Sequence, residues 1–316
     1  MILLFTDTHL SDTNREYSDK AWDMALSLAK KHQCKHVVHL GDVFESRRSQ
    51  TLENLRNIEQ KISMFEDYDL HVLAGNHDKT DTMSNESWLS LYSLGRRKYF
   101  ETNKARFHLL DYFDEGEPYL FHLEGLELSK NKKNILLTHI GVNEYFAGTV
   151  LQDAKISKIR SSIFQGFEKV YIGHYHNTKQ FGNVIYTGST FQASFGEDEQ
   201  KGFWLLDAEG LGEFVPSNIS YFKTVHTDTP TVAEVSKQMT KEGRYRIVTS
   251  AEILDEDKKW FLENNIKILQ TRESSVGEVA SVVGNYDLMT LFEKFCKKRN
   301  IQNEYGRKVL EKCGMS

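Results

Sequence analysis

Five short polar clusters, each standing where an apolar run ends, constrain the fold of this chain more than any other feature. The clusters are Asp7-Thr8-His9, Gly41-Asp42, Gly75-Asn76-His77-Asp78, Thr138-His139 and Gly173-His174-Tyr175-His176. Short apolar runs bounded by polar residues are typical of buried strands. Since side chains that follow neighbouring parallel strands gather at one edge of a sheet, the sequence predicts that the clusters meet there.

Helical patterns alternate with the first apolar runs. Predicted strands at residues 2–5, 36–40 and 70–74 precede predicted helices at residues 19–31, 52–65 and 88–94. Short strands with little helix between them follow, at residues 107–110, 119–123, 135–138, 170–173, 184–187 and 203–206. A second sheet packed on the first accounts for this change. The sequence therefore predicts an α/β fold, a four-layer α/β/β/α sandwich.

The pattern changes again between Pro216 and Pro230. A connecting strand is expected at residues 221–225, and from residue 231 the order is helix, strand, helix, strand, which ends near residue 271. This small α/β module carries none of the polar clusters. The expected domains are therefore 1–218, with all the clusters, 219–284, and a C-terminal helical segment at 285–316.

The C-terminal segment has an apolar stripe formed by Leu288, Leu291, Phe292 and Phe295, spaced i, i+3, i+4 and i+7. Residues 285–316 hold seven lysines and arginines against four acidic residues, a net charge of +3 in a chain of net charge −5. Such a helix either packs on its own domain or fits the groove of a partner protein. The sequence leaves both interpretations open.

Composition limits the class of protein. With 39% apolar and 12% aromatic residues, the chain can build a sizeable core, so disorder is not expected. A net charge of −5 argues against a protein that coats nucleic acid by bulk charge, so any DNA contact must use local basic patches or a partner. Candidates are Arg47-Arg48, Arg96-Arg97-Lys98 and residues 130–133, although such patches are more often solvated faces.

The cysteines indicate a reducing compartment. Cys34, Cys296 and Cys313 are odd in number and lack Cys-x-x-Cys spacing, which argues against a disulfide framework or a zinc ribbon. The N-terminal apolar run is too short for a signal peptide, and no later stretch approaches a membrane span. A cytoplasmic protein is expected.

The residue types in the clusters suit a pair of metal ions. Asp7 and His9 are two residues apart, as are His174 and His176, so each pair leaves one face of an extended segment. If Asp42 bridges both ions, two ligand sets follow. The first metal is held by Asp7, His9, Asp42 and His176, and the second by Asp42, Asn76, His139 and His174.

This assignment leaves His77 for proton transfer. The adjacent Asp78 can fix the tautomer of His77 or raise its basicity. A lone Gly-Asp is usually a turn, and a lone strand histidine is usually a core residue. Five such clusters in the order that one bimetal site needs favour a shared function, the metal-assisted hydrolysis of a phosphate ester.

The ordered clusters resemble the calcineurin-like metallophosphoesterase superfamily, whose motifs read D-x-H, G-D, G-N-H-D/E, a lone H and G-H-x-H. Residues 186–197, from Tyr186-Thr187-Gly188-Ser189 to Ser194-Phe195-Gly196-Glu197, are similar to a signature of SbcD-type nucleases, as is the following Lys201-Gly202-Phe203. These nucleases are catalytic subunits of ATP-dependent double-strand-break repair complexes. In layout the chain resembles the recombination endonuclease subunit of tailed bacteriophages.

The resemblance implies a nuclease subunit of a recombination or repair complex, with 3′ to 5′ exonuclease and single-strand endonuclease activity. It also implies two Mn²⁺ ions, with Mg²⁺ as an alternative, and a homodimer in the cytoplasm, the host's if the chain is of phage origin. The substrates would be double-stranded DNA ends, single strands and hairpins. The 219–284 domain would cap the site, and 285–316 would dock on the coiled coil of an SbcC-like ABC ATPase.

One residue departs from the family pattern. Glu45 follows the Gly-Asp-Val-Phe segment, where many cellular members carry a histidine that contacts the phosphate. A carboxylate cannot stabilise negative charge in that way, so Glu45 is either a surface turn residue or one that positions water or a further ion. Two other functions stay open: hydrolysis of small phosphomonoesters or cyclic nucleotides, and a non-catalytic scaffold.

Overall fold

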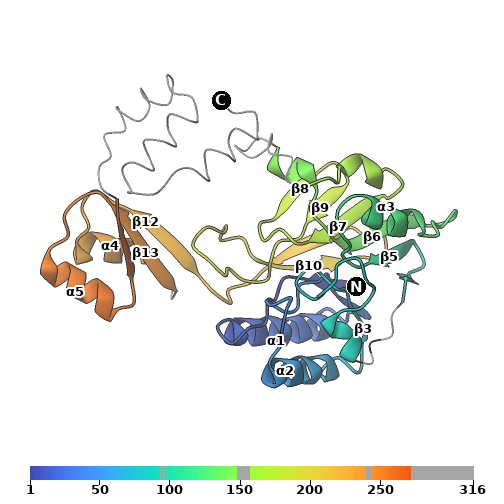
Figure 1. Ribbon diagram of the computed structural model, residues 1–316, viewed down its shortest axis with the longest axis horizontal. Coiled ribbons are helices and arrows are strands. Elements are labelled where there is room, and N and C mark those ends of the chain that lie inside the picture. Colours follow the sequence, from blue (N-terminus) through green and yellow to red (C-terminus); the bar gives the residue numbers. More distant parts are fainter. Residues whose placement is uncertain (93, 95–96, 148–156, 240–242, 272–316) are drawn as a thin grey trace, which may run out of the picture. The chain divides into compact units, whose positions relative to one another are not determined.

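The computed structural model describes residues 1–92, 94, 97–147, 157–239 and 243–271 (Figure 1). Two compact units divide the chain. The first is Met1–Lys223 with Lys241–Arg244, and the second is Thr224–Thr240 with the residues from Tyr245 onward. The predicted C-terminal helices at 285–316 lie outside the described residues.

A five-stranded sheet in the order β11-β10-β1-β2-β3 forms the first layer of strands in the first unit. Its strands are β1 (Ile2–Phe5), β2 (His36–His39), β3 (Asp69–Val72), β10 (Gly202–Leu206) and β11 (Gly212–Pro216). Strands β1, β2 and β3 run parallel, whereas β10 and β11 are antiparallel to their neighbours. The carboxyl ends of the parallel strands therefore share one edge, where the first three polar clusters begin.

A six-stranded sheet in the order β4-β5-β6-β7-β9-β8 forms the second layer of strands. Its strands are β4 (Tyr99–Glu101), β5 (Ala105–Leu110), β6 (Lys133–His139), β7 (Lys169–Gly173), β8 (Lys179–Phe181) and β9 (Val184–Tyr186). The inner strands β5, β6, β7 and β9 are parallel, and the antiparallel β4 and β8 close the edges. The last two clusters lie at the carboxyl ends of β6 and β7.

The helices of the first unit are α1 (Arg15–Lys31), α2 (Leu52–Ser63) and α3 (Glu117–Glu124), with 3₁₀-helices η1 (Trp88–Leu91), η2 (Asn143–Phe146) and η4 (Ser161–Phe164). Helix α1 buries Ala21, Trp22, Ala25 and Leu28, which lie on one face at helical spacing. In the part of the chain that the structure describes, no helix is both long and apolar enough to cross a membrane.

Three clusters of buried apolar side chains lie between successive layers of the first unit. Leu3 and Phe5 of β1 face a core that contains Trp22 of α1, whereas the alternate residues Ile2 and Leu4 face a second core shared with the other sheet. A third core lies between the far face of the second sheet and a layer with α3, η2 and η4. The order is thus helices, sheet, sheet, helices (Figure 1), and the predicted α/β class is confirmed.

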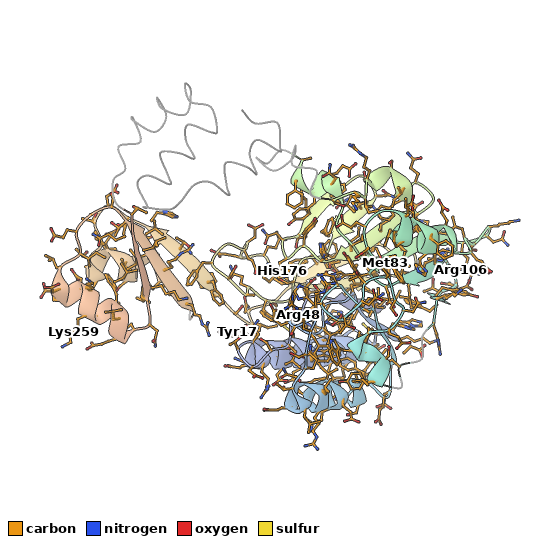
Figure 2. All side chains as sticks on the ribbon, viewed as in Figure 1. Tyr17, Arg48, Met83, Arg106, His176 and Lys259 are labelled. Carbon is orange, nitrogen blue, oxygen red and sulfur yellow. The ribbon has the colours of Figure 1, made fainter. Side chains whose placement is uncertain are left out.

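The second unit is built on a three-stranded sheet in the order β12-β13-β14. Its elements are β12 (Phe222–His226), α4 (Val232–Gln238), β13 (Arg244–Thr249), α5 (Asp255–Glu263) and β14 (Lys267–Gln270). Val235, Ile247 and Phe261 are fully buried and come from α4, β13 and α5. Figure 2 shows the side chains, with Arg48 and His176 on the first unit and Lys259 on the second.

Two predicted elements differ from the structure. The strand expected at residues 119–123 is wrong, because these residues lie in α3. Pro118 stands in the first turn of α3, where a missing N–H costs nothing, and Tyr119 and Leu123 are buried four residues apart on one helical face. The helix expected at 88–94 is only the single 3₁₀ turn of η1.

Buried His71 on β3 makes the fold sensitive to acid. Burial lowers the pKa of His71 to about 4, and the positive charges of His36 and Arg97 contribute to this shift. Its ring is 6% exposed and stacks on Phe100 with 4.8 Å between centroids. The unfolded chain takes up this proton near pH 6.5. The stabilisation is therefore complete above pH 6.5 and is lost as the pH falls toward 4.

We expect His71→Leu to make the free energy of unfolding less sensitive to acid. Between pH 7 and pH 5 the wild-type protein should lose about 2 kcal/mol more than the variant, because leucine binds no proton. Urea denaturation at the two pH values measures the difference. His226→Leu, at an exposed position, is the control and should lose as much as the wild type. Equal losses in all three proteins would contradict a neutral His71.

Candidate metal centre

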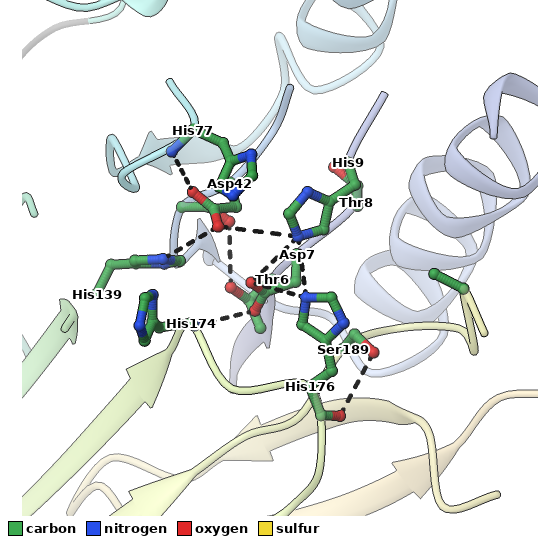
Figure 3. A network of polar contacts seen from close by, with 12 residues as sticks. Thr6, Asp7, Thr8, His9, Asp42, His77, His139, His174, His176 and Ser189 are labelled. Atoms are coloured by element: carbon green, nitrogen blue, oxygen red, sulfur yellow. Dashed lines mark hydrogen bonds and ion pairs between the residues drawn. The ribbon is translucent and has the colours of Figure 1, made fainter. Parts of the chain in front are cut away.

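The five polar clusters meet at the shared edge of the two sheets. Figure 3 shows side chains from both sheets turned toward one point, with Asp7, His9, Asp42 and His77 from the first sheet and His139, His174 and His176 from the second. Four of the predicted ligands, Asp7, His9, Asp42 and His139, are buried, between 0% and 4% exposed, whereas Asn76, His174 and His176 are partly exposed. Their charged and polar atoms can therefore interact strongly with one another and with a cation.

Among the described residues, three groups of potential ligand atoms are present, each with its atoms within 4.8 Å of one another. His9, Glu45 and His77 form one of them, and the other two match the predicted ligand sets. One of these two groups is Asp7, His9 and His176. The other is Asp42, His139 and His174, and Asn76 belongs with it, because its Oδ1 lies 2.9 Å from Nδ1 of His174 and 3.2 Å from Nε2 of His139. The structure thus brings the predicted metal ligands together in the two predicted sets.

One oxygen of Asp42 lies between the two groups. Its Oδ2 is 3.3 Å from Nε2 of His139 in one group and 3.8 Å from Nε2 of His9 in the other (Figure 3). The other oxygen, Oδ1, accepts a hydrogen bond from the backbone N–H of His77 at 2.8 Å. This is the arrangement that a carboxylate bridging two ions requires.

The donor set fits divalent metal ions. Oδ1 of Asp7 is buried without a hydrogen-bond partner among the described residues, and its polar neighbours are Nε2 of His9 at 3.7 Å and Nε2 of His176 at 3.9 Å. The two imidazole nitrogens face each other at 3.0 Å. A buried carboxylate oxygen on which two imidazole nitrogens converge is suited to a cation, and mixed oxygen and imidazole sets suit first-row metals.

The electrostatics of the site favour positive charge. Burial alone would raise the pKa values of Asp7 and Asp42, yet the His9 imidazole beside Asp7 and the charge of His139 beside Asp42 hold both pKa values well below their ordinary value. Against the effect of burial, Asp42 raises the pKa of His139 to about 9. Burial lowers the pKa of His174 to about 4. A metal ion bound here would take the place of protons on the histidines.

Four of these residues have a strained backbone. Asp7, His9, Asp42 and His174 have φ values of 54°, 39°, 55° and 94°, in a region that residues other than glycine rarely adopt. Hydrogen bonds hold them there: the N–H of Asp7 donates to the Gly41 carbonyl at 3.0 Å, and that of His9 to the Asp42 carbonyl at 3.1 Å. Strain maintained by such contacts is typical of functional sites.

Two glycines allow the strand ends to approach one another. Gly41 has a φ of 107°, and a Cβ there would lie 2.6 Å from Nδ1 of His139. A Cβ at Gly75 would lie 2.2 Å from Oδ1 of Asp42 and 2.4 Å from its backbone nitrogen. Both positions therefore require glycine because ligand atoms occupy the space of a side chain.

His77 lies beside the two groups. Its ring centroid is 5.0 Å from that of His9, and its Nδ1 donates a hydrogen bond to the backbone carbonyl of Glu45 at 2.5 Å. This contact leaves Nε2 free to hold a second proton. The residue is partly exposed, so a bound substrate can reach it.

Asp78 does not have the predicted role. Its carboxylate accepts hydrogen bonds from the backbone N–H groups of Val43, Phe44 and Gly75 at 2.9–3.2 Å, and the Glu45 carbonyl, not Asp78, holds the His77 ring. Burial raises the pKa of Asp78 to about 7, and the negative charge of Asp42 contributes to this shift. Asp78 therefore ties the loop after β2 to the loop after β3.

Glu45 and Glu197 contact the outer nitrogens of two predicted ligands. Oε2 of Glu45 lies 3.0 Å from Nδ1 of His9, and Oε1 of Glu197 lies 3.2 Å from Nδ1 of His176. Glu45 is thus more than a surface turn residue. Glu197 is not among the predicted site residues, although it stands in the signature segment four residues before the buried Lys201.

The signature segment also holds the start of β12. The side chain of Gln192 is 1% exposed, and its Oε1 accepts a hydrogen bond from the Phe222 N–H at 2.9 Å. Its Nε2 donates to the carbonyl oxygens of Phe222 at 3.2 Å and Glu197 at 3.0 Å. One buried amide therefore joins the loop that carries Glu197 to the strand that leaves the first unit.

Comparisons with known proteins identify the family of this chain. Residues 1–210 match the calcineurin-like phosphoesterase superfamily domain. Exonuclease subunit 1 of Enterobacteria phage T4 is 23% identical over 216 residues, which cover 64% of this chain and 62% of that protein. DNA double-strand break repair protein Mre11 of Methanosarcina acetivorans is 26% identical over 237 residues, 67% of this chain and 37% of that protein. The chain thus spans less than two thirds of the length of these curated relatives. A dimetal phosphatase from Danio rerio has a TM-score of 0.38 at 13% identity, covering 58% of this chain and 85% of that one.

We expect Gly75→Ala to destroy the metal centre. The added methyl group would overlap Asp42, so the variant should bind no divalent metal ion and lose about 1–3 kcal/mol of stability through overpacking. Calorimetric titration and thermal unfolding measure the two effects. Gly125→Ala is the control, because its Cβ would meet the nearest atom at an ordinary 3.5 Å. Normal ion binding by Gly75→Ala would refute this account of the glycine.

Proposed function

We propose, because this chain belongs to the calcineurin-like phosphoesterase superfamily, that it hydrolyses phosphodiester bonds in DNA as the nuclease subunit of a recombination or repair complex. The observation that carries the proposal is the place of Asp42. Its Oδ2 lies between two groups of ligand atoms, and His77 stands beside both without belonging to either predicted ligand set. A site for two metals and a separate proton donor is what phosphodiester hydrolysis needs.

The proposed ligands are those of the two groups. Asp7, His9 and His176 would hold one ion, Asn76, His139 and His174 the other, and Asp42 would contact both. We propose Mn²⁺ for both positions, because carboxylate, amide and imidazole ligands together suit it, and Mg²⁺ as the alternative. When bound, two such ions supply charge neutralisation for the phosphate and make a water molecule more acidic.

The protein's own residues would handle the proton that the leaving oxygen needs. His77 donates its Nδ1 hydrogen to the Glu45 carbonyl, which fixes the ring and leaves Nε2 to carry the transferable proton. Its backbone N–H is bound to Asp42, so the ring keeps its place relative to the ligand groups. His77 is therefore the proposed general acid for the departing sugar oxygen.

DNA is proposed as the substrate because of two sequence similarities. The segment from Tyr186 to Phe203 carries the signature of SbcD-type nucleases, and the curated relatives are an exonuclease subunit and a DNA double-strand break repair protein. The proposed activities are 3′ to 5′ exonuclease and single-strand endonuclease, carried out by a homodimer with an SbcC-like ABC ATPase.

We expect purified protein with Mn²⁺ to cleave end-labelled linear and hairpin DNA. His77→Ala should bind two Mn²⁺ ions as the wild type does but cleave about 10²- to 10⁴-fold more slowly, since only the proton donor is lost. Gel assays of cleavage and calorimetric titration of the ions provide the two measurements. Glu213→Gln, on the exposed strand β11, is the control variant and should cleave normally.

Two outcomes would contradict this proposal. Cleavage by His77→Ala at the wild-type rate would remove His77 from the mechanism. Rapid turnover of small phosphomonoesters or cyclic nucleotides without cleavage of DNA would leave the metal site in place but replace the proposed substrate.

The C-terminal segment is proposed to bind the ATPase partner. Deletion of residues 287–316 should abolish co-purification with the ATPase and leave basal Mn²⁺-dependent cleavage unchanged, because none of the ligand residues lies in that segment. Pull-down and cleavage assays on the same preparations test both points. If the truncated protein still binds the ATPase, the segment instead packs on its own domain.

A further inference from the structure

Both histidines of the group Asp7, His9 and His176 are held from outside by a carboxylate. His9 turns Nε2 inward, 3.7 Å from Oδ1 of Asp7, and its Nδ1 lies 3.0 Å from Oε2 of Glu45. His176 also turns Nε2 inward, 3.9 Å from the same Asp7 oxygen, and its Nδ1 lies 3.2 Å from Oε1 of Glu197. In each of these imidazoles, Nε2 therefore faces the proposed metal position and Nδ1 faces a carboxylate.

The histidines of the other group are held differently. Nδ1 of His139 donates to the backbone carbonyl of Leu40 at 2.9 Å, and this carbonyl orients the ring but brings no net negative charge. His174 turns Nδ1 inward, 2.9 Å from the amide oxygen of Asn76, itself a proposed ligand. Its outer nitrogen, Nε2, forms no ion pair with a carboxylate of the described residues. The two groups thus differ by two carboxylates that contact their histidines.

Glu197 is held rigidly. Its Oε2 pairs with Nζ of Lys201 at 2.9 Å, and the Lys201 side chain is only 2% exposed. The same Nζ donates to the backbone carbonyl of His176 at 2.6 Å. Lys201 thus contacts both the Glu197 carboxylate and the backbone of His176, and Glu197 contacts the His176 ring. These contacts form a closed network that fixes the Glu197 carboxylate.

Glu45 has more freedom. Its side chain is 48% exposed, and its position on the loop after β2 is fixed through its backbone, which accepts the hydrogen of His77 and donates to the Leu10 carbonyl at 3.1 Å. A substitution of its carboxylate therefore leaves these backbone contacts in place. This makes Glu45 the better of the two residues to test.

We propose that Glu45 and Glu197 are positioning residues that make the group Asp7, His9 and His176 the tighter of the two metal sites. The inference rests on the proposed two-metal function. A carboxylate on the outer nitrogen fixes the tautomer, orients the ring and strengthens the inner nitrogen as a ligand, and its loss typically weakens metal binding about 10- to 100-fold. The two ions then bind in order, and the first occupies the group next to the carboxylates.

Titration of the metal-free, full-length protein with MnCl₂ tests the inference. Calorimetry gives the two dissociation constants, and electron paramagnetic resonance counts free Mn²⁺. The wild type should bind one ion at least about 10-fold more tightly than the other. Glu45→Ala should weaken the tighter site about 10- to 100-fold and leave the weaker site unchanged, and Glu45→Gln, which keeps an oxygen near His9, should weaken it less.

Three further variants complete the experiment. Glu199→Gln removes a charge from the same loop as Glu197, where its contact with the Tyr221 hydroxyl is 3.2 Å, and should leave both constants unchanged. Glu197→Gln should weaken the tighter site as well, with thermal unfolding as a check because Lys201 loses its anionic partner. Glu45→Asp should restore part of the affinity that Glu45→Ala loses.

The possible failures can be told apart. Two equal dissociation constants in the wild type, or unchanged constants in Glu45→Ala, would overturn this inference and leave the proposed function standing. A wild-type protein that binds no Mn²⁺ would overturn both. If Glu45→Ala weakened Mn²⁺ binding only at the weaker site, Glu45 would act on the other metal site, and the inference would be rejected.

Discussion

The carboxylate of Asp42 is the contact on which the metal centre depends. Its Oδ2 lies within 3.8 Å of a histidine from each ligand group, and its Oδ1 accepts the N–H of His77. Its backbone carbonyl accepts the N–H of His9, which connects the ends of β1 and β2. The cost of its positive φ is tolerated because so many contacts fix the same position. The proposed metal ligands, the proposed proton donor and the strand ends are thus parts of one arrangement.

Each ligand group draws on both sheets. Asp7 and His9 follow β1 in the first sheet and His176 follows β7 in the second, and the other group is divided in the same way. The spacing of the ligand atoms therefore depends on the apolar core between the sheets, where Ile2 and Leu4 meet residues of β6. Conversely, ions bound at these positions would join the two sheets and stabilise the folded state by mass action.

The sequence predicted those features that depend on the chain's periodicity. Residues two apart after a strand leave the same face, so the pairing of His174 with His176 could be foreseen. Contacts that depend on loop conformation could not: Asp78 is adjacent to His77 yet binds backbone amides, and Glu197 reaches His176 across 21 residues. The short apolar run in α3 was read as a strand because its length suits either element.

Hydrogen bonds between Gln192 and Phe222 connect the loop that carries Glu197 to β12. Phe222 is the first residue of β12, and the strand continues into the second unit. Tension along β12 would act first on the buried amide of Gln192, which also holds the carbonyl of Glu197. A shift of the strand at Phe222 would therefore disturb the hydrogen bonds that hold the loop of Glu197, whose carboxylate contacts His176, a proposed metal ligand.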